Sequence, residues 1–258
     1  MRRVHFPILV PLLALTILAS TRAAEPALLS PELASAHAHY TARRDADAKA
    51  AFAAILAANP NDAVAEYYLG RLAKRTKDWE RVAAHYERCT RLEPANALYW
   101  ADLGEAYGKL AGKASIFRQL GLARKCRSAL ETAVELAPEE IEYRRGLAEF
   151  YEKAPSIAGG GHGKALAQAA EIAKRDPFAG AMTTGSIEAH ARNWPQAEAA
   201  FRDAAMLRPE SAEPQVALGD MLLRAGRKDA ARHAFETALR IVPNHPRAVD
   251  GLARLGPE

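Results

Sequence analysis

The glycine-rich run Gly159–Lys164 is the segment whose composition comes nearest to a ligand-binding loop. Glycines ahead of a helix can present backbone N–H groups to a phosphate. The phosphate-loop pattern also requires a glycine where this chain has Ala158, and a serine or threonine where it has Ala165. We therefore predict a flexible turn between two helices, with a weaker anion site beside His162 and Lys164 as the alternative.

The other polar residues form no recognisable catalytic or metal-binding pattern. His37 and His39 are two positions apart, so on a helix their imidazoles point in different directions and do not easily share one metal ion. The motifs HExxH and GxSxG and the cysteine spacing of zinc sites do not occur in the sequence. We therefore predict a protein that is not an enzyme and carries no cofactor and no metal.

The two cysteines, Cys89 and Cys126, are too few for a disulfide-stabilised scaffold. In an oxidising compartment they can pair with each other. Both also fall where a repeat described below places small residues, and a free cysteine packs as a small hydrophobic side chain. We favour packing, because a sequence does not supply the Cα separation that a disulfide requires.

Composition and charge narrow the class of protein. Alanine accounts for 58 of the 258 residues, which favours helices with small packed side chains and excludes an all-β protein. The formal charge is +4, but three arginines lie in the expected leader described next, which leaves 32 basic against 31 acidic residues. A nearly neutral chain gives no electrostatic support for nucleic-acid binding.

The first residues have the pattern of a Sec-type signal peptide. Arg2 and Arg3 precede an apolar run, and small residues allow cleavage after Ala23. The alternative, a retained membrane anchor, is disfavoured because the run is short and contains Pro7 and Pro11. We expect a leader at residues 1–23 and an exported chain of residues 24–258 with no membrane insertion after cleavage. The expected location is the periplasm.

A repeat runs through the remaining chain. Prolines close similar phrases at separations of 34, 44, 39, 32 and 34 residues; they are Pro60, Pro94, Pro138, Pro177, Pro209 and Pro243. Ahead of these prolines, small and aromatic residues recur on one helical face, as in Val82, Tyr86 and Cys89, or Ala231, Phe235 and Ala238. One helix pair cannot bury its apolar face alone, whereas a stack of pairs can.

Trp100, Leu103, Gly104 and Tyr107 form the pattern W-x2-L-G-x2-Y, and here the chain resembles the tetratricopeptide repeat family. The resemblance implies an all-α, right-handed superhelical α-solenoid of helix hairpins. The expected units, called repeats 1 to 6, are residues 30–60, 63–94, 97–138, 141–177, 179–209 and 212–243, with a cap helix at 246–255. In each unit a small residue of the first helix admits a larger side chain of the second.

The first helices of such a solenoid line its concave face, which predicts a groove for an extended peptide or a partner protein. The residues expected there are Tyr67, Arg71, Lys74 and Arg75 in repeat 2, Glu105 and Lys109 in repeat 3, and Arg145 and Glu149 in repeat 4. We expect an acidic segment or a terminal carboxylate to dock on the basic group of repeat 2. Ordinary solvated helix faces are the alternative.

Repeats 3 and 4 are longer than the others, within 108–123 and 155–163. We expect the extra residues to lie between the two helices of each repeat and to meet in one protruding surface that includes Phe117, Arg118 and His162. That surface either binds a partner or only seals an edge.

The predicted function is therefore a non-catalytic protein-interaction or assembly module of the bacterial periplasm. The alternative is a cell-envelope hydrolase or polysaccharide-processing factor, for which no residues can be named. The partner and the oligomeric state do not follow from the sequence.

Overall fold

The computed structural model of the chain describes Ala27 and residues 30–256, without the side chains of Ile116 and Phe117. The expected leader at residues 1–23 lies outside the described residues. None of the helices in the described part combines the length and apolar character needed to cross a membrane.

The described residues form thirteen α-helices and one short 3-10 turn, arranged as successive antiparallel pairs. The helices are α1 Pro31–Thr41, α2 Asp45–Ala58, α3 Ala63–Arg75, α4 Trp79–Leu92, α5 Ala97–Ala111, α6 Ile116–Leu136, α7 Ile141–Lys153, α8 His162–Ala173, α9 Pro177–His190, α10 Trp194–Leu207, α11 Glu213–Arg224, α12 Lys228–Ile241 and α13 Pro246–Leu255, with the 3-10 turn η1 at Ser156–Ala158. The expected all-α solenoid of helix hairpins is confirmed.

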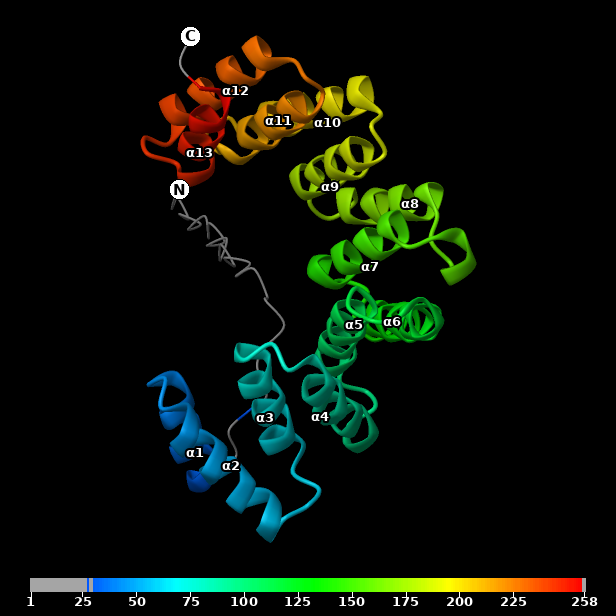
Figure 1. The fold of residues 1–258 in the computed structure, drawn as a ribbon, viewed down its shortest axis with the longest axis vertical. Helices are drawn as coiled ribbons and strands as arrows, with labels where there is room; N and C mark the ends of the chain where they lie inside the picture. The colour runs from blue at the N-terminus through cyan, green and yellow to red at the C-terminus, as the bar shows by residue number, and fades with distance from the viewer. Residues whose placement is uncertain (1–26, 28–29, 257–258) are drawn as a thin grey trace, which may run out of the picture.

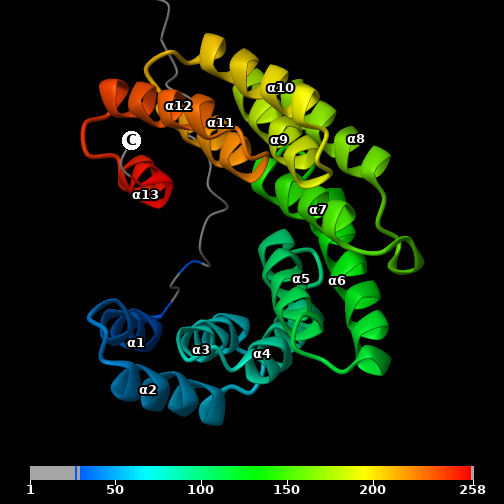
Figure 2. The same cartoon turned by 45° about the horizontal axis from the view of Figure 1, so that its top comes forward.

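The helix pairs stack into a curved array that is open on one side (Figure 1). From α1 to α11 the odd-numbered helices lie on the inner side of the curve and their even-numbered partners lie outside. The view in Figure 2 shows the same arc, with α1 and α13 at its two ends. The inner helices therefore form one concave surface.

Local signals account for several helix ends. The side chains of Asp62, Asp78 and Asn96 each accept a hydrogen bond from a backbone N–H in the first turn of the helix that follows. Pro177 differs from the expected role of closing a repeat, because it is the first residue of α9 and follows the capping residue Asp176. A proline is tolerated there because the first helical N–H has no partner within the helix.

The core is built from small residues that face larger ones. A Cβ atom placed on Gly70 would lie 2.5 Å from the ring of Tyr86, and one on Gly219 would lie 2.5 Å from the ring of Phe235. Gly185 has the same relation to Phe201 in the fifth helix pair, where the sequence motif was least clear. These close approaches fix the spacing between the two helices of a pair.

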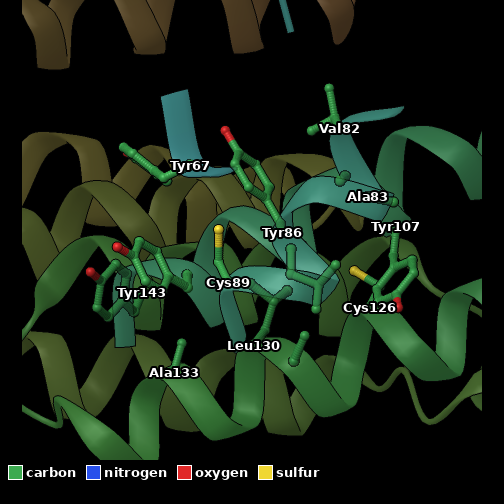
Figure 3. Close-up of a cluster of buried hydrophobic side chains, with 14 of the residues drawn as sticks. Tyr67, Val82, Ala83, Tyr86, Cys89, Tyr107, Cys126, Leu130, Ala133 and Tyr143 are labelled. Carbon is green, nitrogen blue, oxygen red and sulfur yellow. The ribbon is translucent and has the colours of Figure 1, made fainter. Parts of the chain in front are cut away.

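Buried side chains form two clusters, one running from α1 to α8 with Ile187 of α9, the other from α9 to α13. Figure 3 shows part of the first cluster, in which Tyr67, Tyr86, Cys89 and Leu130 lie together. Cys89 and Cys126 are both buried and free, so packing is the correct interpretation of the two thiols. Burial raises the pKa of the Cys126 thiol to about 12, which leaves it protonated and unreactive at neutral pH.

The extra residues of repeat 3 do not form a loop, contrary to expectation. They lengthen the helices, so that α5 has 15 residues and α6 has 21, and only residues 112–115 connect them. Extending a helix adds one backbone hydrogen bond for each residue, which favours helix over loop once the first turn exists. The extra residues of repeat 4 do form a connection, which contains η1.

Candidate functional site

Two adjoining hollows occupy the concave face. The first has a volume of about 670 Å³ and lies between α5, α6 and α7; the second has about 640 Å³ and lies between α7, α9 and α11. Glu149 and Lys153 of α7 line both hollows, so the two hollows adjoin along α7. We call this surface the concave groove.

The first hollow has a floor of small and apolar residues and a charged border. Gly104, Gly108 and Gly146 lie beside Tyr143 and Phe150. Glu105 and Lys109 stand at its edge, as the sequence predicted for repeat 3. A Cβ atom on Gly104 would lie 2.7 Å from the side chain of Leu130, so this glycine lets α5 and α6 pack closely where they line the hollow.

The second hollow contains the predicted Arg145 and Glu149 together with residues that sequence reasoning missed. Phe178 and Met182 of α9 supply apolar surface, while Arg208 and Arg224 lie at the border. The guanidinium of Arg208 pairs with Asp176 at 2.7 Å and stands 4.2 Å from the ring centre of Phe178. The irregular fifth repeat hid Phe178 and Met182, because its first helix could not be aligned from the motif.

Tyr67 does not present its ring to a partner, contrary to expectation. It is 1% exposed and packs among the rings of Tyr68, Tyr86 and Tyr99. Because α4, α2 and α1 pack against α3, and Tyr99 of α5 also reaches Tyr67, most faces of α3 are covered. Tyr67 is therefore a core residue of the first cluster.

The basic residues of repeat 2 have partners within the chain. Arg71 donates to the hydroxyls of Tyr40 at 3.2 Å and Tyr67 at 3.0 Å. The side chain of Arg75 forms an ion pair with Asp45, and its guanidinium carbon lies 3.8 Å from the ring centre of Tyr40. These contacts occupy the arginine donors that the predicted acidic docking site needs.

Lys74 of repeat 2 likewise reaches a neighbouring repeat, where it pairs with Glu105 at 2.5 Å. This contact joins α3 to α5 across the inner surface. Lys74 and Arg75 are therefore paired with acids, and Arg71 is hydrogen-bonded to two tyrosines, so these contacts compete with the docking of an acidic segment on repeat 2.

Asp102 is a half-buried acid of the concave groove that the sequence did not single out. Burial raises the pKa of its carboxyl above the usual value, although the nearby Lys74 acts in the opposite direction. A hydrogen bond from the Tyr67 hydroxyl also favours the ionised form, but burial outweighs it. Asp102 lies within the W-x2-L-G-x2-Y motif, between Trp100 and Leu103, yet Lys74 and Tyr67, which act on it, belong to repeat 2.

The raised pKa of Asp102 predicts a stability that falls as pH rises. Between the pKa of Asp102 in the unfolded chain and its higher pKa in the folded protein, the folded protein binds more protons than the unfolded chain. Raising the pH through this window therefore destabilises the folded protein. We expect Asp102→Asn to melt at a higher temperature than the wild type above the window, with the difference vanishing below about pH 4. Thermal melts over a pH series measure this, with Asp203→Asn on the exposed face of α10 as control. A constant difference at every pH would contradict the prediction.

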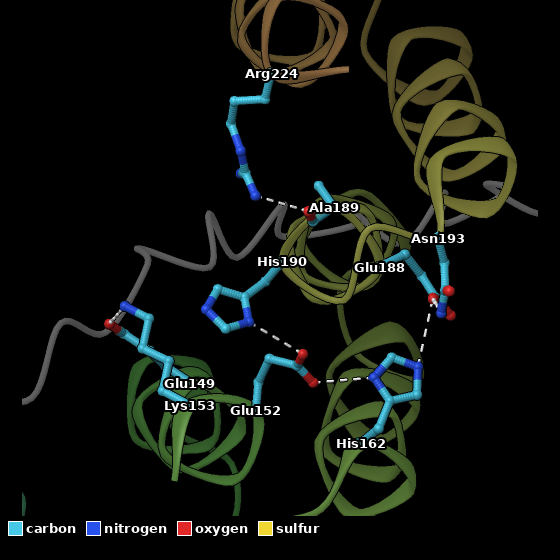
Figure 4. A network of polar contacts seen from close by, with 9 residues as sticks. All are labelled: Glu149, Glu152, Lys153, His162, Glu188, Ala189, His190, Asn193 and Arg224. Atoms are coloured by element: carbon cyan, nitrogen blue, oxygen red, sulfur yellow. Dashed lines mark hydrogen bonds and ion pairs between the residues drawn. The ribbon is translucent and has the colours of Figure 1, made fainter. Parts of the chain in front are cut away.

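His162 lies in a network of acids rather than at an anion site (Figure 4). Its Nδ1 is 3.0 Å from Glu152 and its Nε2 is 3.4 Å from Glu188. The second oxygen of Glu152 lies 3.2 Å from Nδ1 of His190, and Asn193 donates to Glu188 at 2.7 Å. Two carboxylates beside the imidazole would repel an anion, so the anion site that the sequence left as an alternative is disfavoured here.

This network joins α7, α8 and α9 through residues that are ten to 38 positions apart in the chain. The side chains of Glu152 and Glu188 are only 8% and 10% exposed. Among Ala27 and residues 30–256, no group of three or more His, Cys, Asp or Glu side chains is arranged to hold a metal ion. The network is therefore a link between neighbouring repeats.

The longer repeats 3 and 4 border the same space. Gln119 and Ala123 of α6 line the first hollow together with Ala154 and Pro155. A direct contact also joins the two elements, because Nη1 of Arg127 lies 3.5 Å from the carbonyl oxygen of Ala158. Ile157 is 68% exposed and so does not seal the edge; the side chain of Phe117 lies outside the described residues.

Comparison with known proteins agrees with the helix pairs. The sequence profile of the tetratricopeptide repeat matches residues 183–246, from within α9 to the start of α13. Over these residues the chain matches the tetratricopeptide repeat family. The profile spans most of repeat 5 and all of repeat 6, and the helix hairpins continue on its N-terminal side.

Solved structures with the same fold are distant in sequence. A tetratricopeptide repeat protein from Parabacteroides merdae aligns with a TM-score of 0.56 and 14% identity, over 87% of this chain and 97% of that chain. Yeast Tom70 aligns with a TM-score of 0.54 and 16% identity, over 81% of this chain and 42% of that chain. The Cut9–Hcn1 hetero-tetramer of the APC/C aligns with a TM-score of 0.54 and 16% identity, over 88% of this chain and 42% of that chain. At such identities the comparison shows that the chain shares the fold of these proteins.

Proposed function

We propose that the whole chain is a tetratricopeptide repeat protein, and that it is a non-catalytic interaction or assembly module that binds an extended segment of a partner protein in the concave groove. The observation that carries the proposal is that the two hollows adjoin, with Glu149 and Lys153 lining both. Together the two hollows cross the inner helices α5, α7, α9 and α11, and an extended polypeptide can bind along such a path.

The groove also has the chemistry that suits a polypeptide. Apolar surface from Tyr143, Phe150, Phe178 and Met182 alternates with charged borders. Apolar anchors in a bound segment give affinity, whereas charges at the rim mainly give selectivity and faster association. Many of the border charges are already paired, as Lys153 is with Glu149 at 2.5 Å, so the groove does not select strongly for one sign of charge.

The location is part of the same proposal. The predicted leader at residues 1–23 supports export to the periplasm, and the partner would then be a protein of the cell envelope. The edge formed by the longer repeats 3 and 4 is proposed as a second contact surface beside the groove.

Site-specific photo-crosslinking tests this function in living cells. A photoreactive amino acid at Ala101 or Ser186, which line the first and second hollows, is expected to form covalent adducts with a distinct polypeptide. The same amino acid at Asp203, on the exposed surface of the outer helix α10, is the control. Equal adducts at all three positions, or none in the groove, would count against the proposal.

A further inference from the structure

Basic residues are concentrated in one hairpin of an otherwise acidic chain. Between Glu105 and Glu131 the chain has six basic residues and no acidic one. Outside this stretch, the chain from residue 24 onward has 26 basic against 31 acidic residues. The near-neutral total therefore hides a local excess of positive charge.

These residues lie where α5 and α6 extend beyond the length of an ordinary repeat. We use the name basic hairpin end for Lys109, Lys113, Arg118 and Arg124, all of which are exposed. Among the described residues, none of these four has an ion-pair partner. By contrast, Lys125 lies 3.6 Å from Glu87, so that cation is partly neutralised.

Helix stability does not account for all of this charge. Arg118 is the third residue of α6, where the positive end of the helix dipole disfavours a cation. The first turn of α6 contains no acidic residue, and the side chain of Ser115 makes no capping hydrogen bond. The arginine at this place therefore opposes the local preference of the helix.

The basic hairpin end is continuous with the concave groove. Lys109 lines the first hollow, as does Gln119, which follows Arg118 in α6. An extended segment that leaves the groove at this point would pass over the unpaired cations. A short segment would meet mainly this hairpin, whereas a long nucleic acid or a lipid surface would also meet the acidic remainder of the chain.

We propose that the basic hairpin end binds an acidic segment of the partner polypeptide, next to the residues held in the concave groove. This inference rests on the proposed function and adds the charge of the partner to it. Carboxylates of the segment would pair with the four exposed cations. Because such exposed pairs are screened by salt, the contact contributes selectivity and depends strongly on ionic strength.

Fluorescence anisotropy of the full mature chain with a labelled oligo-glutamate peptide tests the inference. Charge reversal of Lys109 and Arg118 to glutamate is expected to weaken binding about tenfold at low ionic strength, because two attractions become repulsions. Reversal of Lys113 and Arg124 should act in the same direction. The matched control reverses Lys49 and Lys228, which are exposed on α2 and α12 and give the same change in net charge.

The outcomes separate the explanations. A loss of binding confined to the hairpin variants, and abolished in about 0.5 M salt, supports the inference. An equal loss in the Lys49 and Lys228 control, or no loss in the hairpin variants, overturns it. Binding of duplex DNA or phosphatidylglycerol vesicles through these residues, without binding of oligo-glutamate, also overturns it.

The failure of this inference differs from failure of the proposed function. Crosslinks from Ser186 can persist while charge reversal in the basic hairpin end leaves oligo-glutamate binding unchanged. In that case the proposed function of the groove stands, and only the inference of an acidic partner segment is wrong. Circular dichroism and thermal melts of each variant exclude unfolding as the cause, since all of these side chains are exposed.

Discussion

Replacing Phe235 with alanine is expected to lower the free energy of unfolding by about 3–5 kcal/mol, the usual cost of removing a buried aromatic side chain. Phe235 is fully buried in α12 and its ring lies between two glycines. Cβ atoms placed on Gly219 of α11 or Gly251 of α13 would each lie 2.5 Å from that ring. The ring therefore joins the last helix pair to the terminal helix, and its loss leaves a cavity shared by three helices.

Urea denaturation followed by circular dichroism measures this cost, and a pair of glycine substitutions provides its control. Gly219→Ala is expected to destabilise the protein by about 1–3 kcal/mol, because the ring of Phe235 cannot move aside without disturbing the packing. Gly121→Ala, at an exposed site of α6 with open space around it, is expected to stabilise the protein by up to about 1 kcal/mol. The same sign for both substitutions would contradict the packing described here.

Replacing Arg88 with methionine is expected to destabilise the protein by about 1–3 kcal/mol, because it removes a cation that pairs with a buried acid. The Glu66 side chain of α3 is 1% exposed and pairs with Arg88 Nη1 at 2.9 Å and His85 Nδ1 at 2.7 Å. The Arg88 side chain is 45% exposed, so the substitution removes little buried surface of Arg88 itself. The cost arises because a carboxylate held away from water loses much of its compensating charge.

A double-mutant cycle separates this effect from the other contacts of Arg88. The Nη2 atom of Arg88 also donates to the carbonyl oxygen of Pro60 at 2.8 Å, and methionine removes that bond in every background. Adding Glu66→Gln to Arg88→Met should recover part of the lost stability, because a neutral amide needs no cation. Arg81→Met, on the exposed face of the same helix, should change stability by less than about 0.5 kcal/mol. Strict additivity of the two changes would show that Glu66 and Arg88 are not coupled.

The sequence by itself determined the class of fold and much of the helix packing. The W-x2-L-G-x2-Y pattern around Gly104 and the spacing of the prolines indicate helix pairs, because helical periodicity and proline chemistry act over a few residues. Gly219 and Phe235 are also recognisable as packing partners, since the motif places them at equivalent positions in each unit. Such local information is sufficient to predict which helices pair, although Pro177 begins a helix where a repeat was expected to close, and α6 begins earlier than expected.

The tertiary structure decided which side chains of the concave face are available to a partner. Tyr67 has the helical position of a groove residue but is buried, because α4 and α5 bring Tyr86 and Tyr99 against it. Arg71 and Arg75 are engaged by residues of α1 and α2 that lie 30 to 35 positions earlier in the chain. Whether a charge is neutralised depends on these distant neighbours, which the repeat motif does not specify.

The same physical reason explains the longer repeats. Counting residues located the additions to repeats 3 and 4, but only the structure showed that the first lengthens α6 into 21 helical residues. It also placed His162 between Glu152 and Glu188, acids from two other helices, where the local sequence had left an anion site open. Helix periodicity is a property of near neighbours, whereas the charge and access of a site come from the stacking of separate repeats.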